Sequence, residues 1–249
     1  MKKVFRACLM CMSMFLAIPI PIKKWDEEAR PLMTLFLPLV GAVVGGLWML
    51  LSYLLRLLDL PVLIAAAALT AYPFLITGGM HFDGFLDTVD AVKSWRGPEE
   101  RRRIIKDPHV GSFAVIAAVL LVMAQFAFFA SVKEEADIFT LLLIPVVSRI
   151  TAALAVTLLR PISVSEYAGA YQKGIRKSHV VILAVLYALV TAAGFVFLGK
   201  YGFAAIAVTA GYLLFLIRGF RSLNGMSGDI SGYALVCGEL AGIAVYALV

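Results

Sequence analysis

A chain of 249 residues with 62% hydrophobic content and a mean hydropathy of +0.94 is too apolar for an ordinary soluble domain or a disordered segment. Its formal net charge of +6 does not indicate nucleic-acid binding, because the basic residues lie in the short breaks between apolar stretches. These features predict an all-α, polytopic transmembrane helical bundle that forms a single domain over residues 1–249.

The first 20 residues are basic and then apolar, but the apolar run is short for a membrane span. Its roughly 15 residues fall below the roughly 20 that cross the hydrocarbon core of a bilayer. A secretory signal begins in this way, yet Ile18-Pro19-Ile20-Pro21 stands where a cleavage site needs small residues. We therefore expect this segment to remain in the protein as a short interfacial or re-entrant helix.

Longer apolar stretches follow and predict about seven membrane-spanning helices. They cover approximately residues 32–57, 61–75, 110–132, 138–159, 180–198, 201–217 and 230–249. In the first of them, the spacing of Gly41 and Gly45 permits another helix to approach closely. Residues 78–109 form the longest polar stretch, and Pro98 followed by two glutamates predicts a short helix within it.

The polar stretch opens with an acidic motif. If it is helical, Asp83, Asp87 and Asp90 stand at positions i, i+4 and i+7 on one face. Like charges destabilise a bare helix, and oxygen ligands of this kind suit Mg²⁺, Mn²⁺ or Ca²⁺. Because the chain has only 16 acidic residues, we favour a metal site over a solvated acidic face. The neighbouring His81 is a candidate metal ligand, base or hydrogen-bond partner.

The basic residues predict an orientation in the membrane. If residues 78–109 face the cytoplasm, residues 160–178 and 218–229 do so too, and the breaks near residues 59, 134 and 200 lie outside. The basic residues of the three inside loops are Lys93, Arg96, Arg101, Arg102, Arg103, Lys106, Arg160, Lys173, Arg176, Lys177, Arg218 and Arg221, against Arg56, Lys133 and Lys200 outside. The positive-inside rule therefore places the acidic motif on the cytoplasmic side, beside cations that suit phosphate.

Arg149 lies near the middle of an apolar run, where a charged side chain needs an internal partner. The sequence leaves two alternatives open: an ion pair with an acid such as Glu239, or contact with a substrate phosphate. In both cases we expect Arg149 to face the interior of the bundle.

Two helix starts carry further candidates. Around Lys106 and Gly111, free N–H groups at the start of a long helix are suited to phosphate, and a merely well-capped helix start is the alternative. In the glycine-rich turn at residues 223–232, the sequence alone favours helix capping as the role of Asp229. The chain has no G-x-S-x-G, phosphate-loop or G-x-G-x-x-G motif, so hydrolase, nucleotide-loop and dinucleotide-binding classes lack support.

Four stretches, spread from residue 36 to the C-terminal region, together resemble the cobalamin synthase family, adenosylcobinamide-GDP ribazoletransferase. They are Phe36-x-Pro38-Leu39-Val40-Gly41, Thr77-Gly78-Gly79-x-His81-x-Asp83-Gly84-x-x-Asp87-x-x-Asp90, Lys106-Asp107-x-x-x-Gly111 and Gly228-Asp229-x-x-Gly232, with Ser148-Arg149 as a fifth. The aspartate motif is specific, whereas each of the other stretches alone is weak.

The resemblance implies an integral membrane transferase that uses Mg²⁺, held by Asp83, Asp87 and Asp90. Such an enzyme joins adenosylcobinamide-GDP to α-ribazole, or to its 5′-phosphate, and releases GMP, which assembles the lower ligand of vitamin B12. On this basis we assign catalysis to His81, Asp83, Asp87, Lys106 and Asp107. We assign substrate binding to Arg149, Arg218, Arg221, Asn224 and Asp229.

The same reading places the protein in the cell inner membrane as a multi-pass protein surrounded by lipid, with its active site on the cytoplasmic side. We expect no nucleic-acid partner, and the sequence leaves a homo-oligomer open.

Two other classes compete with this interpretation. A CDP-alcohol phosphatidyltransferase also has an aspartate-rich metal helix, but its motif requires Asp-Gly-x-x-Ala-Arg, and here Asp83-Gly84-Phe85-Leu86 is followed by Asp87. A small cation transporter would place its acids near the bilayer midplane in discontinuous helices. The acidic motif here instead follows the end of an apolar stretch, which favours an enzyme.

Overall fold

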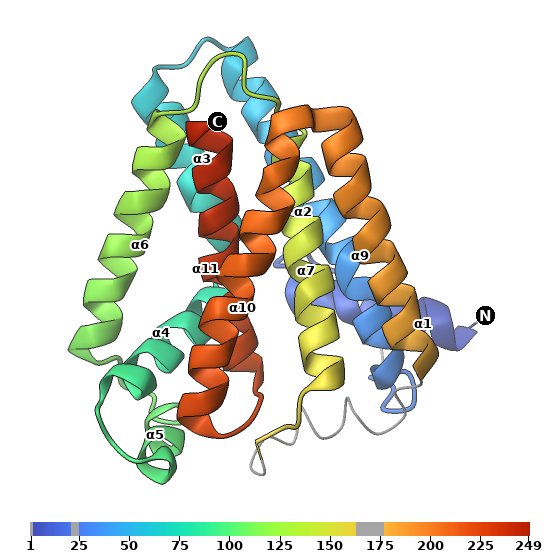
Figure 1. Ribbon diagram of the computed structural model, residues 1–249, viewed down its shortest axis with the longest axis vertical. Coiled ribbons are helices and arrows are strands. Elements are labelled where there is room, and N and C mark those ends of the chain that lie inside the picture. The colour runs from blue at the N-terminus through green and yellow to red at the C-terminus, as the bar shows by residue number, and fades with distance from the viewer. Residues whose placement is uncertain (1, 21–24, 163–176) are drawn as a thin grey trace.

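The computed structural model describes residues 2–20, 25–162 and 177–249. The regular secondary structure of this part of the chain is helical, apart from one isolated bridge between Pro161 and Met226. In chain order the elements are α1 (Lys2–Phe15), η1 (Arg30–Phe36), α2 (Leu37–Leu57), α3 (Val62–Ile76), α4 (Met80–Lys93), α5 (Pro98–Ile104), α6 (Ser112–Ala130), α7 (Thr140–Leu158), α9 (Lys177–Leu198), η2 (Gly199–Gly202), α10 (Phe203–Leu223) and α11 (Gly228–Leu248) (Figure 1). The predicted all-α transmembrane bundle is confirmed.

The predicted count of seven spans is not confirmed. By length and composition, the described residues contain 5 stretches that can cross a membrane, or up to 6 if the bent pair α3 and α4 is one span. The 5 are Arg30–Leu57, Ser112–Ala130, Thr140–Leu158, Lys177–Leu223 and Gly228–Leu248. Lys177–Leu223 contains α9 and α10, which fold back on each other at η2, so that the hydroxyl groups of Tyr187 and Thr209 lie 2.8 Å apart. The other predicted span that is not among the 5 is α3, whose 15 residues are fewer than the roughly 20 that cross the hydrocarbon core.

The polar elements gather at one end of the bundle, as the charge pattern predicts. Helices α4 and α5 and the turn between α10 and α11 lie at the lower end in Figure 1. The side chains of Arg101 and Arg102 tie α5 to the end of α10 by donating to the carbonyl oxygens of Ser222 and Leu223, at 3.5 and 2.9 Å. Lys173 and Arg176, which were also predicted to face this side, lie outside the described residues.

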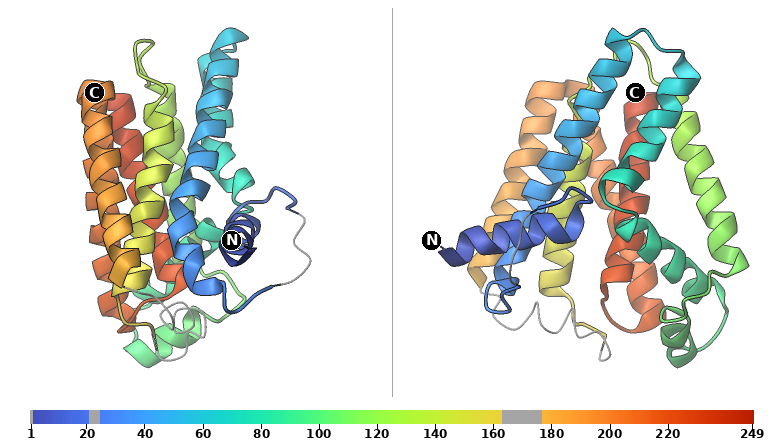
Figure 2. Two further views of the ribbon diagram at one scale, coloured as in Figure 1. Left: turned by 90° about the vertical axis from the view of Figure 1, so that its right-hand side faces the viewer. Right: turned by 180° about the vertical axis from the view of Figure 1, so that it is seen from behind.

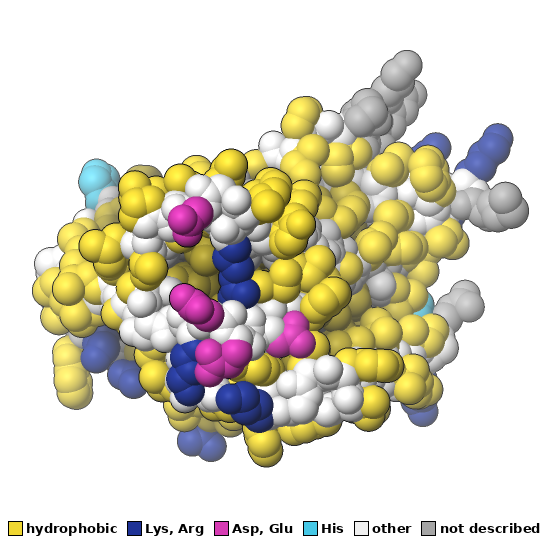
Figure 3. Space-filling view, turned by 90° about the horizontal axis from the view of Figure 1, so that it is seen from above, with side chains coloured by type: hydrophobic (Ala, Val, Ile, Leu, Met, Phe, Trp, Pro, Cys, Tyr) yellow, Lys and Arg dark blue, Asp and Glu magenta, His cyan; other side chains and the backbone are white. Residues whose placement is uncertain are grey.

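The opposite end carries a small charged group within a largely hydrophobic surface (Figure 3). Arg56 donates to the carbonyl oxygens of Glu134 and Ala136, at 3.4 and 3.3 Å. Lys133 donates to the C-terminal residue Val249 at 3.3 Å. These contacts bring the breaks near residues 59 and 134 together at the end away from the acidic motif, as expected.

Helix α1 lies across the bundle and not along it (Figure 2). It has 14 residues, and the chain just after it is held at the end of α3, because the Ala17 N–H donates to the Ile76 carbonyl at 2.8 Å. Arg6 pairs with Asp26 at 2.8 Å. This crosswise position supports the interfacial alternative for the N-terminal segment.

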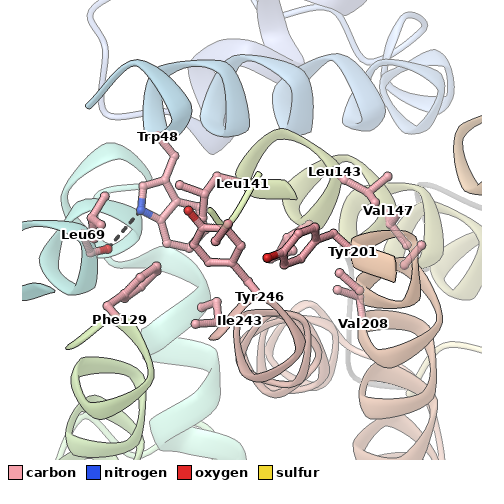
Figure 4. Packing of buried hydrophobic residues seen from close by; sticks show 14 of the residues in the cluster. Trp48, Leu69, Phe129, Leu141, Leu143, Val147, Tyr201, Val208, Ile243 and Tyr246 are labelled. Carbon is pink, nitrogen blue, oxygen red and sulfur yellow. Dashed lines mark hydrogen bonds between the residues drawn. The ribbon is translucent and has the colours of Figure 1, made fainter. Parts of the chain in front are cut away.

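Close helix packing forms the core. A Cβ atom at Gly41 would lie 2.5 Å from the Pro145 carbonyl oxygen, so α2 and α7 touch through their backbones at the predicted small-residue position. Beside this contact, the indole of Trp48 is fully buried and donates to the Leu69 carbonyl at 3.0 Å (Figure 4). Phe129 packs edge-on against the same indole, which joins α2, α3 and α6.

Candidate functional site

A sharp bend between α3 and α4 positions the acidic motif. The two helices meet at 90°, and the link contains Gly78 and Gly79 with φ of +61° and +76°. Residues with a side chain rarely adopt this left-handed backbone, which explains the paired glycines. The Thr77 hydroxyl donates to the Pro73 carbonyl at 2.7 Å and closes the last turn of α3. Helix α4 therefore turns away from the direction of α3 and carries His81 and Asp83 in its first turn.

The predicted acidic face exists, and it packs against the start of α11. Asp83 is exposed, whereas Asp87 and Asp90 are partly buried. A Cβ atom at Gly84 would lie 2.8 Å from the Cα atom of Asp229, so α4 and α11 are in backbone contact at this point. Glycine at position 84 thus permits the carboxylates of the two helices to come together.

Asp229 faces the acidic motif and does not cap its helix. The cap of α11 is Ser227, whose hydroxyl accepts from the Ile230 N–H at 3.3 Å. Asp83, Asp229 and Asp90 all act electrostatically on Asp87. The capping role that the sequence favoured for Asp229 is therefore wrong. Sequence reasoning missed Ser227, although its place before a glycine and an aspartate at a helix start was an available signal.

Asp90 bridges α4 and α6. Its two carboxylate oxygens accept from the N–H groups of Gly111 and Ala114, at 2.5 and 2.9 Å. The sequence left two alternatives for the stretch around Lys106 and Gly111: a phosphate site or a capped helix start. The structure supports the capped helix start, because the Asp90 carboxylate already binds the N–H groups of Gly111 and Ala114. The predicted role of Asp90 as a metal ligand stays a prediction.

The donor chemistry of the site fits a hard divalent cation that also binds phosphate. Among the described residues, no group of three or more His, Cys, Asp or Glu side chains is arranged to hold a metal ion by itself. Mg²⁺ is usually held by only one or two carboxylates together with water and substrate phosphates. Asp83, Asp87 and Asp229 offer oxygen donors of this kind, so the residues present fit Mg²⁺ completed by a substrate.

A cavity of about 280 Å³ lies beside the acidic motif. Its lining comes from α1, η1, α2, α4, α7, the turn before α11 and α11 itself. The residues that line it are Met14, Phe15, Met33, Thr34, Leu37, Met80, His81, Arg149, Ala152, Val156, Met226, Ser227, Gly228, Asp229, Ser231, Gly232 and Leu235. The rings of Phe15 and His81 lie 5.8 Å apart, which places α1 against the start of α4. Of the predicted site residues, His81, Arg149 and Asp229 thus share one cavity.

Arg149 is 1% exposed and forms an ion pair with Glu239 of α11. Ser148 joins the pair, since its hydroxyl donates to Glu239 at 2.8 Å and accepts from Arg149 at 2.9 Å. The interior position and the predicted partner are both confirmed. The Nε atom of Arg149 is buried without a hydrogen-bond partner among the described residues, and the side chain lines the cavity.

The other predicted substrate-binding residues lie around the end of α10. Arg218 and Arg221 are exposed and flank Gly219, where a Cβ atom would lie 3.7 Å from Thr88 of α4. Asn224 ends α10 in the left-handed conformation, with φ of 56°. Its side-chain oxygen accepts from Arg160. The structure thus brings α10 against α4, whereas the side chain of Asn224 binds Arg160 and does not line the cavity.

Lys106 and Asp107 lie in the exposed loop between α5 and α6, outside the lining of the cavity. The Asp107 carboxylate accepts from the backbone N–H of His109 at 3.0 Å and pairs with its ring at 2.7 Å. The hydrogen bond from this N–H, followed by the one from the ring, lowers the pKa of Asp107. Neither Lys106 nor Asp107 is among the residues that line the cavity, so the catalytic role assigned to them stays a prediction.

Comparison with known proteins agrees with this arrangement. The model of the family described as cobalamin-5-phosphate synthase matches residues 7–247. A protein of Clostridium perfringens named adenosylcobinamide-GDP ribazoletransferase is 34% identical, with 100% of both chains covered. A protein of Clostridium botulinum with the same name is 34% identical over 98% of this chain and 97% of its own.

A protein of Lachnoclostridium phytofermentans, again with that name, is 34% identical over 94% of this chain and 90% of its own. No solved structure matches the chain. The family match spans nearly all of the sequence, including the acidic motif of α4 and the start of α11. The chain belongs to the cobalamin-5-phosphate synthase family.

Proposed function

We propose that the protein is an adenosylcobinamide-GDP ribazoletransferase. The observation that carries this proposal is the contact of α4 with α11, which brings Asp229, a residue of the cavity lining, to the helix that carries Asp83 and Asp87. Carboxylates that hold a divalent cation against a diphosphate are the basic requirement of this type of transfer. The family match and the names of the relatives support the same reaction.

In the proposed reaction, a ribose hydroxyl oxygen of α-ribazole, or of its 5′-phosphate, bonds to the phosphorus atom on the cobinamide side of the diphosphate. The bond from that phosphorus to the oxygen bridging to GMP breaks, and GMP leaves with the bonding electrons. The hydroxyl proton passes to a base, for which His81 in the cavity is our candidate. The products are adenosylcobalamin, or its 5′-phosphate, and GMP.

Asp83 and Asp87 would hold Mg²⁺, with Asp229 as a further carboxylate that acts on Asp87. When bound, Mg²⁺ would neutralise charge on the diphosphate oxygens. Arg218 and Arg221, exposed beside α4, would hold the leaving nucleotide by charge-assisted hydrogen bonds. The main work of the chain is to position two substrates, because phosphoryl transfer depends chiefly on positioning and electrostatics.

We also propose that the protein is a multi-pass protein of the cell inner membrane with this site on the cytoplasmic side. The support is the charge pattern, since the end of the bundle that carries the site also carries most loop Lys and Arg residues. Exposed apolar side chains on α6 and α9, such as Leu120 and Leu189, would contact lipid.

The test is a condensation assay with detergent-solubilised protein, Mg²⁺, adenosylcobinamide-GDP and α-ribazole, with product and GMP followed by chromatography. We expect stoichiometric release of GMP, loss of turnover with EDTA and recovery with added Mg²⁺. A parallel assay with CDP-alcohol lipid substrates should give no transfer. Transfer only in that parallel assay would overturn the proposal, and full turnover in EDTA would overturn the Mg²⁺ assignment.

A further inference from the structure

The cavity beside the acidic motif has the size of a nucleoside pocket. At about 280 Å³, it lies near the lower end of the roughly 300–1,000 Å³ typical of small-molecule sites. A corrin macrocycle with its side chains is several times larger than a nucleoside and does not fit within such a volume. The size of the cavity therefore suits a bicyclic base with its ribose better than it suits a corrin ring.

The walls of the cavity are suited to an apolar, planar base. Met14, Met33 and Met226 line it together with Phe15 and Val156. Methionine side chains adapt to the shape of a ligand and make favourable contacts with aromatic rings. A guanine base, with hydrogen-bonding groups along two edges, would leave most of those groups unpaired against these walls, at a cost in affinity. The lining therefore favours a base with few polar groups.

Polar groups line the part of the cavity nearest the acidic motif. Asp229 and Ser227 lie at the start of α11, where Asp229 approaches the carboxylates of α4. Arg149 is buried in the lining, and its Nε atom has no hydrogen-bond partner within the described part of the chain. A nucleoside whose base occupies the apolar part would thus have its ribose toward Asp229, on the side where the diphosphate of the donor is proposed to bind.

We infer that this cavity is the binding site of the acceptor, α-ribazole, with its dimethylbenzimidazole between the methionine side chains and a ribose hydroxyl directed to the acidic motif. The inference rests on the proposed function, which supplies a nucleoside with an apolar bicyclic base as one of two substrates. It adds that the N-terminal helix α1, through Met14 and Phe15, forms part of the acceptor pocket.

The test fills the pocket without touching the acidic motif. Val156 on α7 lines the cavity and is only partly buried, so Val156→Phe adds ring volume toward the acceptor. The matched control is Val119→Phe on α6, where the valine is 53% exposed and lies outside the cavity lining. For each protein we would measure the Kd of radiolabelled α-ribazole alone, and the KM of each substrate during turnover.

We expect Val156→Phe to raise the Kd and the KM for α-ribazole by about tenfold or more, because overpacking a filled site is costly. The KM for adenosylcobinamide-GDP should stay within about twofold of the wild type, as should all constants of Val119→Phe. If Val156→Phe does not give folded protein, Val156→Leu adds one methylene at the same place and should raise both α-ribazole constants to a smaller extent.

Unchanged α-ribazole constants in folded Val156→Phe or Val156→Leu, with an active wild type, would overturn the acceptor site and leave the proposed function intact. A selective rise in the KM for adenosylcobinamide-GDP would also overturn it, because the cavity would then bind the donor. A wild type that neither condenses the two substrates nor binds α-ribazole would instead overturn the proposed function, and the inference with it.

Discussion

Gly84 of α4 and Asp229 of α11 touch through their backbones, since a Cβ atom at position 84 would lie 2.8 Å from the Asp229 Cα atom. Backbone atoms cannot turn aside as a flexible side chain can, so the distance between the two helices is fixed at this point. The contact also sets how far the Asp229 carboxylate lies from those of α4. The geometry of the acidic site therefore depends on a residue that has no functional group.

Replacing Gly84 with alanine should separate α4 from α11 and reduce turnover strongly. A displacement of about 1 Å at a reacting centre can cost roughly 100-fold in rate, and we expect a loss approaching that size. The measurement is kcat in the condensation assay, with folding checked by size-exclusion chromatography. Gly46→Ala is the matched control, because a Cβ atom there meets nothing within 4 Å. Equal activity of Gly84→Ala and Gly46→Ala would refute the importance of this contact.

The three aspartates of α4 should separate into two classes. Asp83→Asn and Asp87→Asn should abolish turnover with little change in thermal stability, because they remove charge proposed to hold Mg²⁺. Asp90→Ala should lower the free energy of unfolding by about 1 kcal/mol, because its carboxylate caps α6. Turnover assays and thermal unfolding on the same preparations check both statements. Normal turnover of the Asp83 and Asp87 variants would remove the metal assignment.

At the start of α11, two neighbouring residues should affect different properties: Ser227 the stability of the protein, and Asp229 its activity. Ser227→Ala removes the cap and should cost about 1 kcal/mol of stability, seen as a lower Tm. Asp229→Asn keeps the side-chain shape and should leave Tm near that of the wild type while it lowers kcat. If Asp229→Asn instead lowered only Tm, Asp229 would have a structural role and no part in the reaction.

The buried pair of Arg149 and Glu239 can be tested with a double-mutant cycle. Arg149→Met or Glu239→Leu alone leaves an unpaired buried charge and should cost roughly 3 kcal/mol or more of stability. The double variant should recover most of this loss, because well-packed apolar residues can replace a buried ion pair. Because Arg149 also lines the cavity, we expect turnover to stay low in the double variant. Recovery of both stability and turnover would restrict Arg149 to a structural role.

Arg221 should act on the donor alone. Arg221→Ala should raise the KM for adenosylcobinamide-GDP by about tenfold, since a charge-assisted hydrogen bond contributes roughly 1.5–3 kcal/mol. The KM for α-ribazole should stay unchanged. Arg103→Ala, at an exposed position on α5, is the control. Unchanged constants in Arg221→Ala would assign the leaving nucleotide to other residues.

Local patterns in the sequence predicted much of the helical structure, and some long-range contacts. Spacing alone placed Asp83 and Asp87 on one helix face, and the position of Arg149 in an apolar run required a buried partner, which is Glu239. The first prediction succeeds because helix periodicity is a property of a single helix. The second succeeds because a charge buried in the membrane requires an opposite charge, and the apolar stretches offer few acidic residues.

The remaining features depend on contacts between segments far apart in the chain. Asp90 caps α6 only because the chain between α4 and α6 folds back and brings Gly111, 21 residues further along the chain, to the Asp90 carboxylate. Nothing near Asp90 in the sequence indicates this contact. The cavity has the same origin, since residues such as Met14 and Val156 meet in it from separate helices. Apolar content alone also did not reveal the 90° bend after α3, and the predicted count of seven spans is not confirmed.

The pairing of Arg149 with Glu239 has a consequence for how the protein is made. Synthesis runs from the N-terminus, so α7 leaves the ribosome with its arginine before α11 and its glutamate exist. An unpaired arginine at the centre of a helix costs about 2.5–3.5 kcal/mol to insert into a membrane. Until α11 is made, the apolar residues of α7 must offset this cost without the counter-charge of Glu239. Truncation of the chain before α11 would leave α7 without its counter-charge, so α11 completes the assembly of a span whose arginine lies 90 residues earlier in the chain.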